Sequence, residues 1–277
     1  MRVKILLFNL CLWMTALVYA QNESGLSGRF ILIDSLQTPS GITFGPAQYA
    51  RFADALICGV TIDQADTVRT GIFLLPLNEP NAVSTELKIP SMGSNTSYLQ
   101  GSSSADGSIL VFTVNHYNGW TGNDLAMCTR LDDGSYSYPA LLSGINKKDT
   151  ADCYPWIADD GRRLYYLQDE RLMVAEWNAS EKSFTTATPV LYTGTVELNI
   201  LSVWLDSKEK HMWLVSDNKI YRASRKNRKK PFSMPELYTD EFADWSFISG
   251  ISFTPDEQDM YLYYADEFSN LLHFKPR

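Results

Sequence analysis

A short phrase that recurs five times, at intervals of about fifty residues, is the feature that most constrains this chain. In each copy an acidic turn lies between two stretches rich in β-branched and aromatic residues. The acidic residues that mark the copies are Asp54, Asp106, Asp160, Asp206 and Asp256. Repeats of this length made of strands are typical of a propeller or a related array. Because aspartate in a turn accepts hydrogen bonds from its own backbone, we interpret these residues as structural.

Each repeat unit divides into four short strands. In the second unit they are expected at residues 98–103, 109–115, 124–130 and 138–142. Pro139, Pro189 and Pro235 recur at one place in the last strand of three units. Proline cannot donate to a β-ladder and is confined to sheet edges, so this strand is predicted to be the outermost one.

The fifth unit ends after its third strand, at residues 270–275, whereas an extra strand, Arg29–Asp34, precedes the first unit. We predict that this strand pairs onto the fifth unit and closes the ring, which removes an exposed sheet edge. The predicted fold is therefore all-β: a single five-bladed β-propeller of four-stranded antiparallel blades. The alternatives are a six-bladed ring and an incompletely closed one.

The first twenty residues are expected to be a secretory signal peptide. Arg2 and Lys4 are followed by a mostly apolar run at residues 5–20, which ends in small residues and is short for a membrane span. The propeller domain would then occupy residues 21–277, with no transmembrane span in the mature chain. We expect export to the periplasm or the extracellular space.

The formal net charge of −8 disfavours a general role in nucleic-acid binding.

The cysteines that remain after the expected cleavage are Cys58, Cys128 and Cys153, an odd number that allows at most one disulfide. Because each lies in or beside a predicted strand, we interpret them as buried hydrophobic residues, and the sequence does not decide whether two of them form a disulfide.

Sequons for N-glycosylation occur at Asn22, Asn95 and Asn178, and the sequence does not decide whether they are used.

A basic run, Arg225–Lys230, falls between the third and outermost strands of the fourth unit. It predicts either a patch for an anionic polymer or lipid headgroup, or a solvated loop on the rim of the propeller. We favour the solvated loop.

The second and third units resemble a known family. The stretches 123–130, 133–142 and 154–166 resemble the WD40-like Pro-Asp repeats of TolB-type propellers from bacterial cell envelopes. The resemblance is good over residues 98–177 and weaker in the first and fourth units, and only the fifth unit has the literal Pro255-Asp256. It implies a β-propeller in the envelope or secreted space that binds partners. The additional domains of larger relatives are not matched, so their functions are not carried over.

Catalytic motifs are weak in this sequence. It has no Gly-x-Ser-x-Gly elbow, no HExxH motif and no phosphate-binding glycine loop, and it indicates no metal or cofactor. A five-bladed glycoside hydrolase that uses axial carboxylates is the alternative function, and it would need two facing carboxylates. The acidic residues considered for that role are Asp63, Asp66, Asp124, Asp152 and Asp217.

The stronger functional candidate is a surface formed by loops. The loop at residues 115–122 contains His116, Tyr117 and Trp120, and we expect Tyr154 and Trp245 on the same face of the ring. Aromatic residues on loops of a rigid scaffold are suited to stacking on sugars or anchoring a peptide. We therefore predict a non-catalytic propeller that binds a protein or glycan partner, or acts as a scaffold in an envelope complex.

Overall fold

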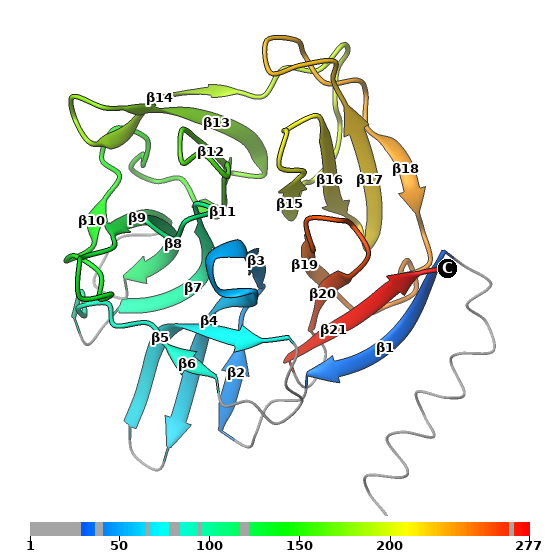
Figure 1. The fold of residues 1–277 in the computed structure, drawn as a ribbon. Coiled ribbons are helices and arrows are strands. Elements are labelled where there is room, and N and C mark those ends of the chain that lie inside the picture. Colours follow the sequence, from blue (N-terminus) through cyan, green and yellow to red (C-terminus); the bar gives the residue numbers. More distant parts are fainter. Residues whose placement is uncertain are drawn as a thin grey trace, which may run out of the picture.

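The computed structural model describes residues 29–36, 41–64, 67–77, 84–93, 96–116, 122–265 and 269–277. Five antiparallel sheets are arranged around a central axis, like the blades of a propeller (Figure 1). The fold predicted from the repeats is confirmed. Within the described residues, no helix has the length and apolar character needed to cross a membrane.

The strands follow the four-strand pattern in every blade. Blade 1 contains β2 (Ile42–Phe44), β3 (Gln48–Ala50), β4 (Ala55–Gln64), β5 (Thr67–Pro76) and β6 (Thr85–Glu86). Blade 2 contains β7 (Thr96–Ser103), β8 (Ile109–His116), β9 (Asn123–Thr129) and β10 (Ala140–Leu141). Blade 3 contains β11 (Asp152–Ile157), β12 (Arg163–Gln168), β13 (Arg171–Asn178) and β14 (Ser183–Pro189). Blade 4 contains β15 (Ser202–Leu205), β16 (His211–Ser216), β17 (Lys219–Ser224) and β18 (Glu236–Thr239). Blade 5 contains β19 (Ile248–Phe253), β20 (Met260–Ala265), β21 (Ser269–Pro276) and β1 (Phe30–Leu36).

Blade 1 differs from the others in its innermost strand. Both β2 and β3 pair with β4, so the inner strand is interrupted at residues 45–47. Gly45 in the interruption packs closely against blade 2, because a Cβ atom there would lie 2.8 Å from the carbonyl oxygen of Leu99. Blade 1 therefore has four strand positions like the other blades, although five strand segments form it.

The N-terminal strand closes the ring as predicted. β1 pairs antiparallel with β21, with Phe30 opposite Pro276 and Leu36 opposite Leu271. The fifth blade thus takes its outermost strand from the start of the chain and its other three from the end (Figure 1). The six-bladed and incompletely closed alternatives were wrong. Closure pairs the edge of β21, which would otherwise present unpaired backbone groups.

The core lies between neighbouring blades. The Trp213 ring is 5.1 Å from Trp204 and 5.2 Å from Phe253, so aromatic side chains of blades 4 and 5 interlock. The Trp213 side chain is almost completely buried. Cys58, Cys128 and Cys153 are all free thiols, the first two of them buried, and burial raises the pKa of each to about 12.

The turn between the first and second strands is the same in all five blades. One residue in each turn has a positive φ and donates its N–H to the carbonyl three residues earlier. These left-handed residues are Asp54, Gly107, Gly161, Glu209 and Glu257. The acidic markers of the repeat therefore do not all occupy one position. Asp54 takes the place of the glycine in blade 1, whereas Asp206 begins the turn in blade 4.

Where the acidic residue precedes the left-handed one, its carboxylate organises the turn. Asp106 Oδ1 accepts hydrogen bonds from the Ser108 N–H at 3.0 Å and from the Ser104 hydroxyl at 2.7 Å. Asp160 and Asp256 accept the corresponding backbone N–H groups of Arg162 and Gln258. The structural interpretation of these aspartates is confirmed.

We expect Asp106→Ala to lower the free energy of unfolding by about 1 kcal/mol at pH 7, the typical net value of a hydrogen bond. The hydrogen bonds from Ser104 and Ser108 lower the pKa of Asp106 below 3.8. A lowered folded-state pKa gives stability that is present above the ordinary value and lost as the pH falls through the folded value. Urea unfolding should therefore show a smaller difference in the free energy of unfolding between the wild type and the Asp106→Ala variant at pH 3 than at pH 7. An equal loss of stability in the variant at both pH values would contradict this account.

The edge prolines lie where the sequence places them. Pro189 ends β14, and Pro139 and Pro235 directly precede β10 and β18, the outermost strands of blades 2 and 4. The outer edges of the blades are thus protected against further pairing by residues that cannot donate.

Candidate functional site

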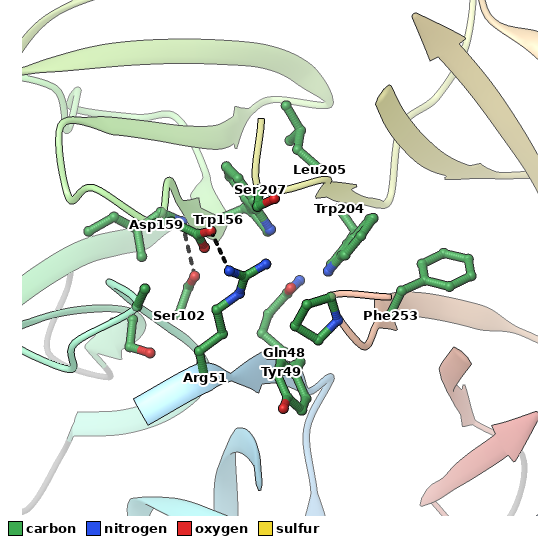
Figure 2. Close-up of a pocket in the computed structure, with 14 residues that line it drawn as sticks. Gln48, Tyr49, Arg51, Ser102, Trp156, Asp159, Trp204, Leu205, Ser207 and Phe253 are labelled. Atoms are coloured by element: carbon green, nitrogen blue, oxygen red, sulfur yellow. Dashed lines mark hydrogen bonds and ion pairs between the residues drawn. The ribbon is translucent and has the colours of Figure 1, made fainter. Parts of the chain in front are cut away.

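The innermost strands of the blades end around a small pocket on the axis, at the end of the ring that carries the repeated turns (Figure 2). We call it the axial pocket, and side chains of all five blades line it. Its lining includes Gln48, Tyr49, Arg51, Ser102, Ser103, Ala105, Trp156, Ile157, Asp159, Trp204, Leu205, Ser207, Phe253 and Pro255. The open volume is about 30 Å³, which is room for one or two water molecules.

An ion pair between Arg51 and Asp159 crosses the axial pocket. The two side chains come from the first turns of blades 1 and 3, and Arg51 Nη1 lies 2.8 Å from Asp159 Oδ2. About a third of each side chain is exposed, 33% and 29%, so solvent reaches the pair. Burial raises the pKa of the Asp159 carboxyl above 3.8, and the Arg51 guanidinium opposes that rise. Figure 2 shows Arg51 extended from its turn toward Asp159.

Two side chains connect blades that are not neighbours in the ring, across its axis. The Gln48 amide of blade 1 donates to the Val203 carbonyl of blade 4 at 3.4 Å. Tyr154 of blade 3 is hydrogen-bonded through its hydroxyl to Ser249 of blade 5. Of the residues in these two bridges, Gln48 lines the axial pocket, and its amide group takes up part of the space between the innermost strands.

Serine hydroxyls join the innermost strands of neighbouring blades. Ser102 accepts a hydrogen bond from the Ile157 N–H, Ser202 from Ile251, and Ser252 from Tyr49. Ser103 also lines the axial pocket, and its hydroxyl is buried without a hydrogen-bond partner among the described residues.

A buried charge cluster borders this region between blades 3 and 4. Glu209 is completely buried, and its carboxylate contacts Arg163 at 2.9 Å, Arg225 at 3.1 Å and Arg228 at 3.0 Å. The Tyr165 hydroxyl donates to the same carboxylate at 2.7 Å. Three guanidinium groups and one hydroxyl thus satisfy a charge that could not otherwise be buried.

The basic run at residues 225–230 is more than the solvated loop that we favoured. Arg225 and Arg228 turn inward to Glu209, and Arg228 also contacts Asp160 at 2.9 Å. Asp160 follows Asp159 of the axial pocket, so the loop lies beside that pocket. The lysines of the run are exposed, and they are Lys226, Lys229 and Lys230. The loop therefore presents positive charge near the pocket, on a chain with a net charge of −8.

Of the residues predicted as a binding surface, His116, Tyr154 and Trp245 fall in the described part of the chain, and none of them lines the axial pocket. His116 ends β8, and nothing is described of its side chain, while Tyr117 and Trp120 lie outside the described residues. Tyr154 has a φ of 53° in a β-bulge of β11, and burial raises the pKa of its hydroxyl to about 12. Trp245 packs edge-on against Phe242 and Tyr264. Both side chains are largely engaged in packing, and their role in binding stays a prediction.

The carboxylates considered for glycoside hydrolysis are not brought together in the axial pocket. Asp152 is fully buried and accepts hydrogen bonds from the Lys147 N–H and the Gln168 amide, and burial raises its pKa. Asp217 lies in a two-residue turn with φ 48°. Asp63 and Asp124 do not line the axial pocket, and Asp66 lies outside the described residues. Of the residues that do line it, Asp159 is the one carboxylate, whereas a glycosidase needs two.

Sequence reasoning missed Arg51, Gln48 and Asp159. One signal was present: Arg51 begins the turn in blade 1, at the position that Ser104, Ala158, Asp206 and Thr254 occupy in the other blades. A basic residue at that position distinguishes one unit of the repeat.

Among the described residues, no group of three or more histidine, cysteine or acidic side chains is placed to hold a metal ion.

Comparison with known proteins supports the fold and leaves the family open. No family model matches the sequence, and no curated protein matches it. A luciferin-regenerating enzyme superposes with a TM-score of 0.56 at 10% identity, over 90% of this chain and 95% of that one. A puromycin hydrolase superposes with a TM-score of 0.52 at 13% identity, over 85% of this chain and 36% of that one. At such identities the likeness shows the fold alone. The non-catalytic role and the TolB-type resemblance therefore stay predictions.

Proposed function

We propose that this chain is an exported binding protein of the cell envelope or extracellular space, which recognises an acidic segment of a protein partner at the axial pocket. The observation that carries the proposal is the solvent-accessible Arg51–Asp159 ion pair. Arginine is suited to binding carboxylates because its planar guanidinium offers parallel N–H donors. Asp159 would occupy Arg51 in the free protein, and a carboxylate of the partner would replace it.

The exchange replaces one arginine–carboxylate contact by another. Because about a third of each side chain is exposed, 33% and 29%, water reaches the pair and a partner carboxylate can approach Arg51. Trp156 and Trp204 line the same pocket, although both side chains are almost fully buried in the core. The exposed lysines of the loop at residues 225–230 would attract an acidic partner over a distance of about 10 Å at ordinary ionic strength.

Binding is favoured over hydrolysis by the charges of the axial pocket. A hydrolase of the glycosidase type requires an acid and a second carboxylate, whereas this pocket offers one carboxylate already paired with arginine. The expected signal peptide supports export, which the structure does not test. The loop at residues 115–122, which the sequence predicts as a recognition surface and most of which lies outside the described residues, is the alternative site.

A double substitution tests the site without leaving a lone charge. We expect Arg51→Met with Asp159→Asn to weaken binding of an eight-residue peptide of Asp and Glu by about tenfold or more, because hydrogen bonds to charged groups contribute about 1.5–3 kcal/mol. The measurement is fluorescence anisotropy at two salt concentrations, with capture of partners from envelope extract as a second arm. Wild-type binding should fall with added salt.

The matched control is Arg69→Met with Glu86→Gln, which removes an exposed ion pair elsewhere on blade 1. It should leave the affinity unchanged. If both double variants retain the partner and Tyr117→Ala with Trp120→Ala loses it, recognition takes place at the loop of residues 115–122 and the proposal is wrong.

A further inference from the structure

Positive charge is concentrated in blade 4. Residues 206–230 contain nine basic and three acidic residues, a formal net charge of +6. Because the whole chain has a net charge of −8, the other residues together carry −14. Exposed basic side chains gather at the end of blades 3 and 4 that carries the repeated turns. They are Arg162, Lys208, Lys210, Lys226, Lys229 and Lys230, and we call them the basic face.

Three loops carry the basic face, and ion pairs hold these loops together. They are the first turn of blade 3, the first turn of blade 4 and the loop at residues 225–231. Arg228 of that loop contacts Glu209 of the blade 4 turn at 3.0 Å and Asp160 of the blade 3 turn at 2.9 Å. The backbone N–H of Arg225 donates to the Lys210 carbonyl at 2.8 Å. The three loops therefore form one continuous surface.

The loop at residues 225–231 is also held in shape by its own hydrogen bonds. Asn227 accepts the Lys229 N–H through its side chain and the Lys230 N–H through its carbonyl, both at 3.0 Å. The arginines of the loop turn inward to Glu209, whereas its lysines are exposed. A surface that is ordered before binding loses less conformational entropy when a partner arrives.

The protein does not neutralise the basic face by itself. None of its six side chains forms an ion pair with a described residue. The carboxylates of the same turns have other partners: Asp160 and Glu209 contact arginines, and Asp206 accepts the backbone N–H groups of Lys210 and His211 at 2.6 and 3.0 Å. Like charges gathered on one surface repel one another, and a bound anion relieves this repulsion.

The distribution of charge favours a linear polyanion over a flat anionic surface. At the same end of the ring, the turns of blades 1, 2 and 5 present the exposed residues Asp54, Asp106 and Asp256. An anionic membrane that covered this end would meet these carboxylates, whereas a chain can follow blades 3 and 4 alone. The three loops of the basic face also lack an exposed large hydrophobic residue that could enter a bilayer.

We propose that the basic face binds a linear anionic polysaccharide, whose sulfate or carboxylate groups contact the lysines. Short runs rich in lysine and arginine are typical of patches that bind heparin-like polymers or nucleic acids. The choice of a polysaccharide rests on the proposed function, since an exported protein meets anionic glycans rather than nucleic acids. Arg51 is not part of the basic face, so binding there does not require the ion pair of the axial pocket.

Fluorescence anisotropy with a labelled heparin octasaccharide tests the inference. We expect binding that weakens with added salt, because the lysines displace counterions from the polymer, and no binding of a neutral dextran of similar length. Lys226→Gln with Lys229→Gln and Lys230→Gln should weaken heparin binding by about tenfold or more, since each lysine near an anionic surface adds to the affinity.

The matched control is Lys147→Gln with Lys148→Gln and Lys219→Gln, which removes the same charge beside the first residue of β11 and at the start of β17, the other ends of blades 3 and 4. It should bind heparin as the wild type does. Arg51→Met with Asp159→Asn should also leave heparin binding unchanged, whereas its effect on the acidic peptide tests the axial pocket. Thermal unfolding establishes that each variant is folded.

Absence of heparin binding by the wild type would overturn the inference, and so would equal affinity of the wild type and the Lys226/Lys229/Lys230 variant. An equal loss in both triple variants would overturn it as well, because net charge rather than the basic face would then govern binding. Tighter binding of a DNA duplex, or of vesicles of phosphatidylcholine with phosphatidylglycerol, than of heparin would show that the ligand is not a polysaccharide.

Discussion

Replacement of Glu209 by glutamine is expected to lower the free energy of unfolding by about 3–5 kcal/mol, the usual cost of removing one partner from a buried ion pair. Glu209 is completely buried and lies between the guanidinium groups of Arg163, Arg225 and Arg228. Without its carboxylate, these three positive charges would face one another between blades 3 and 4. Glutamine has nearly the same shape and retains the residue's positive φ of 52°, so the substitution isolates the charge.

Glu257→Gln is the matched control for Glu209→Gln. Glu257 occupies the same turn position in blade 5, with φ 59°. Burial raises the pKa of Glu257 above 4.5, against the opposing effect of Arg222. A raised carboxyl pKa means that the folded state loses stability as the pH rises above the ordinary value of the carboxyl. Glutamine removes the cost, so we expect this variant to be as stable as the wild type or slightly more stable, within about 1 kcal/mol.

Urea unfolding at pH 7 measures both variants. The slope of the free energy with denaturant should stay constant if the variants change stability alone. A loss of less than about 1 kcal/mol for Glu209→Gln would show that the arginines find other partners or solvent, and that the cluster does not hold blades 3 and 4 together.

The fold could be predicted from the sequence because its determinants are local. Alternating apolar strands, turn aspartates such as Asp106 and edge prolines such as Pro189 each act within a few residues, and five copies reinforce one another. Even the closing strand was predictable, since its apolar residues had no partner in the first unit while the fifth unit lacked a strand.

The candidate site could not be predicted in the same way. Arg51 and Asp159 belong to different blades, and only the closed ring brings their side chains within 2.8 Å. Glu209 and Arg163 are a similar case, because a charged residue in a turn is usually solvated and nothing local indicates its burial. The aromatic residues that we predicted as a binding surface include Trp245, which packs against Phe242 and Tyr264. Composition does not separate an aromatic residue that packs from one that binds.

Substitution of Phe30 by alanine is expected to lower the free energy of unfolding by about 3–5 kcal/mol, the range for large-to-small changes at buried phenylalanines. Phe30 is 2% exposed at the start of β1, and its ring lies 6.1 Å from Tyr238 and 6.4 Å from Phe242. The side chain therefore anchors the strand that closes the ring. When β1 detaches, the edge of β21 is freed and can pair with another molecule.

The matched control for Phe30→Ala is Ile31→Ala, the next residue of the same strand, whose side chain is 44% exposed. We expect this variant to differ from the wild type by less than about 1 kcal/mol. Hydrogen exchange should show faster exchange in the amides of β21 for Phe30→Ala alone, and size-exclusion chromatography should show oligomers of that variant. Equal stability and equal exchange of the two variants would mean that β1 is held by its backbone pairing with β21, so that closure of the ring would not depend on the Phe30 anchor.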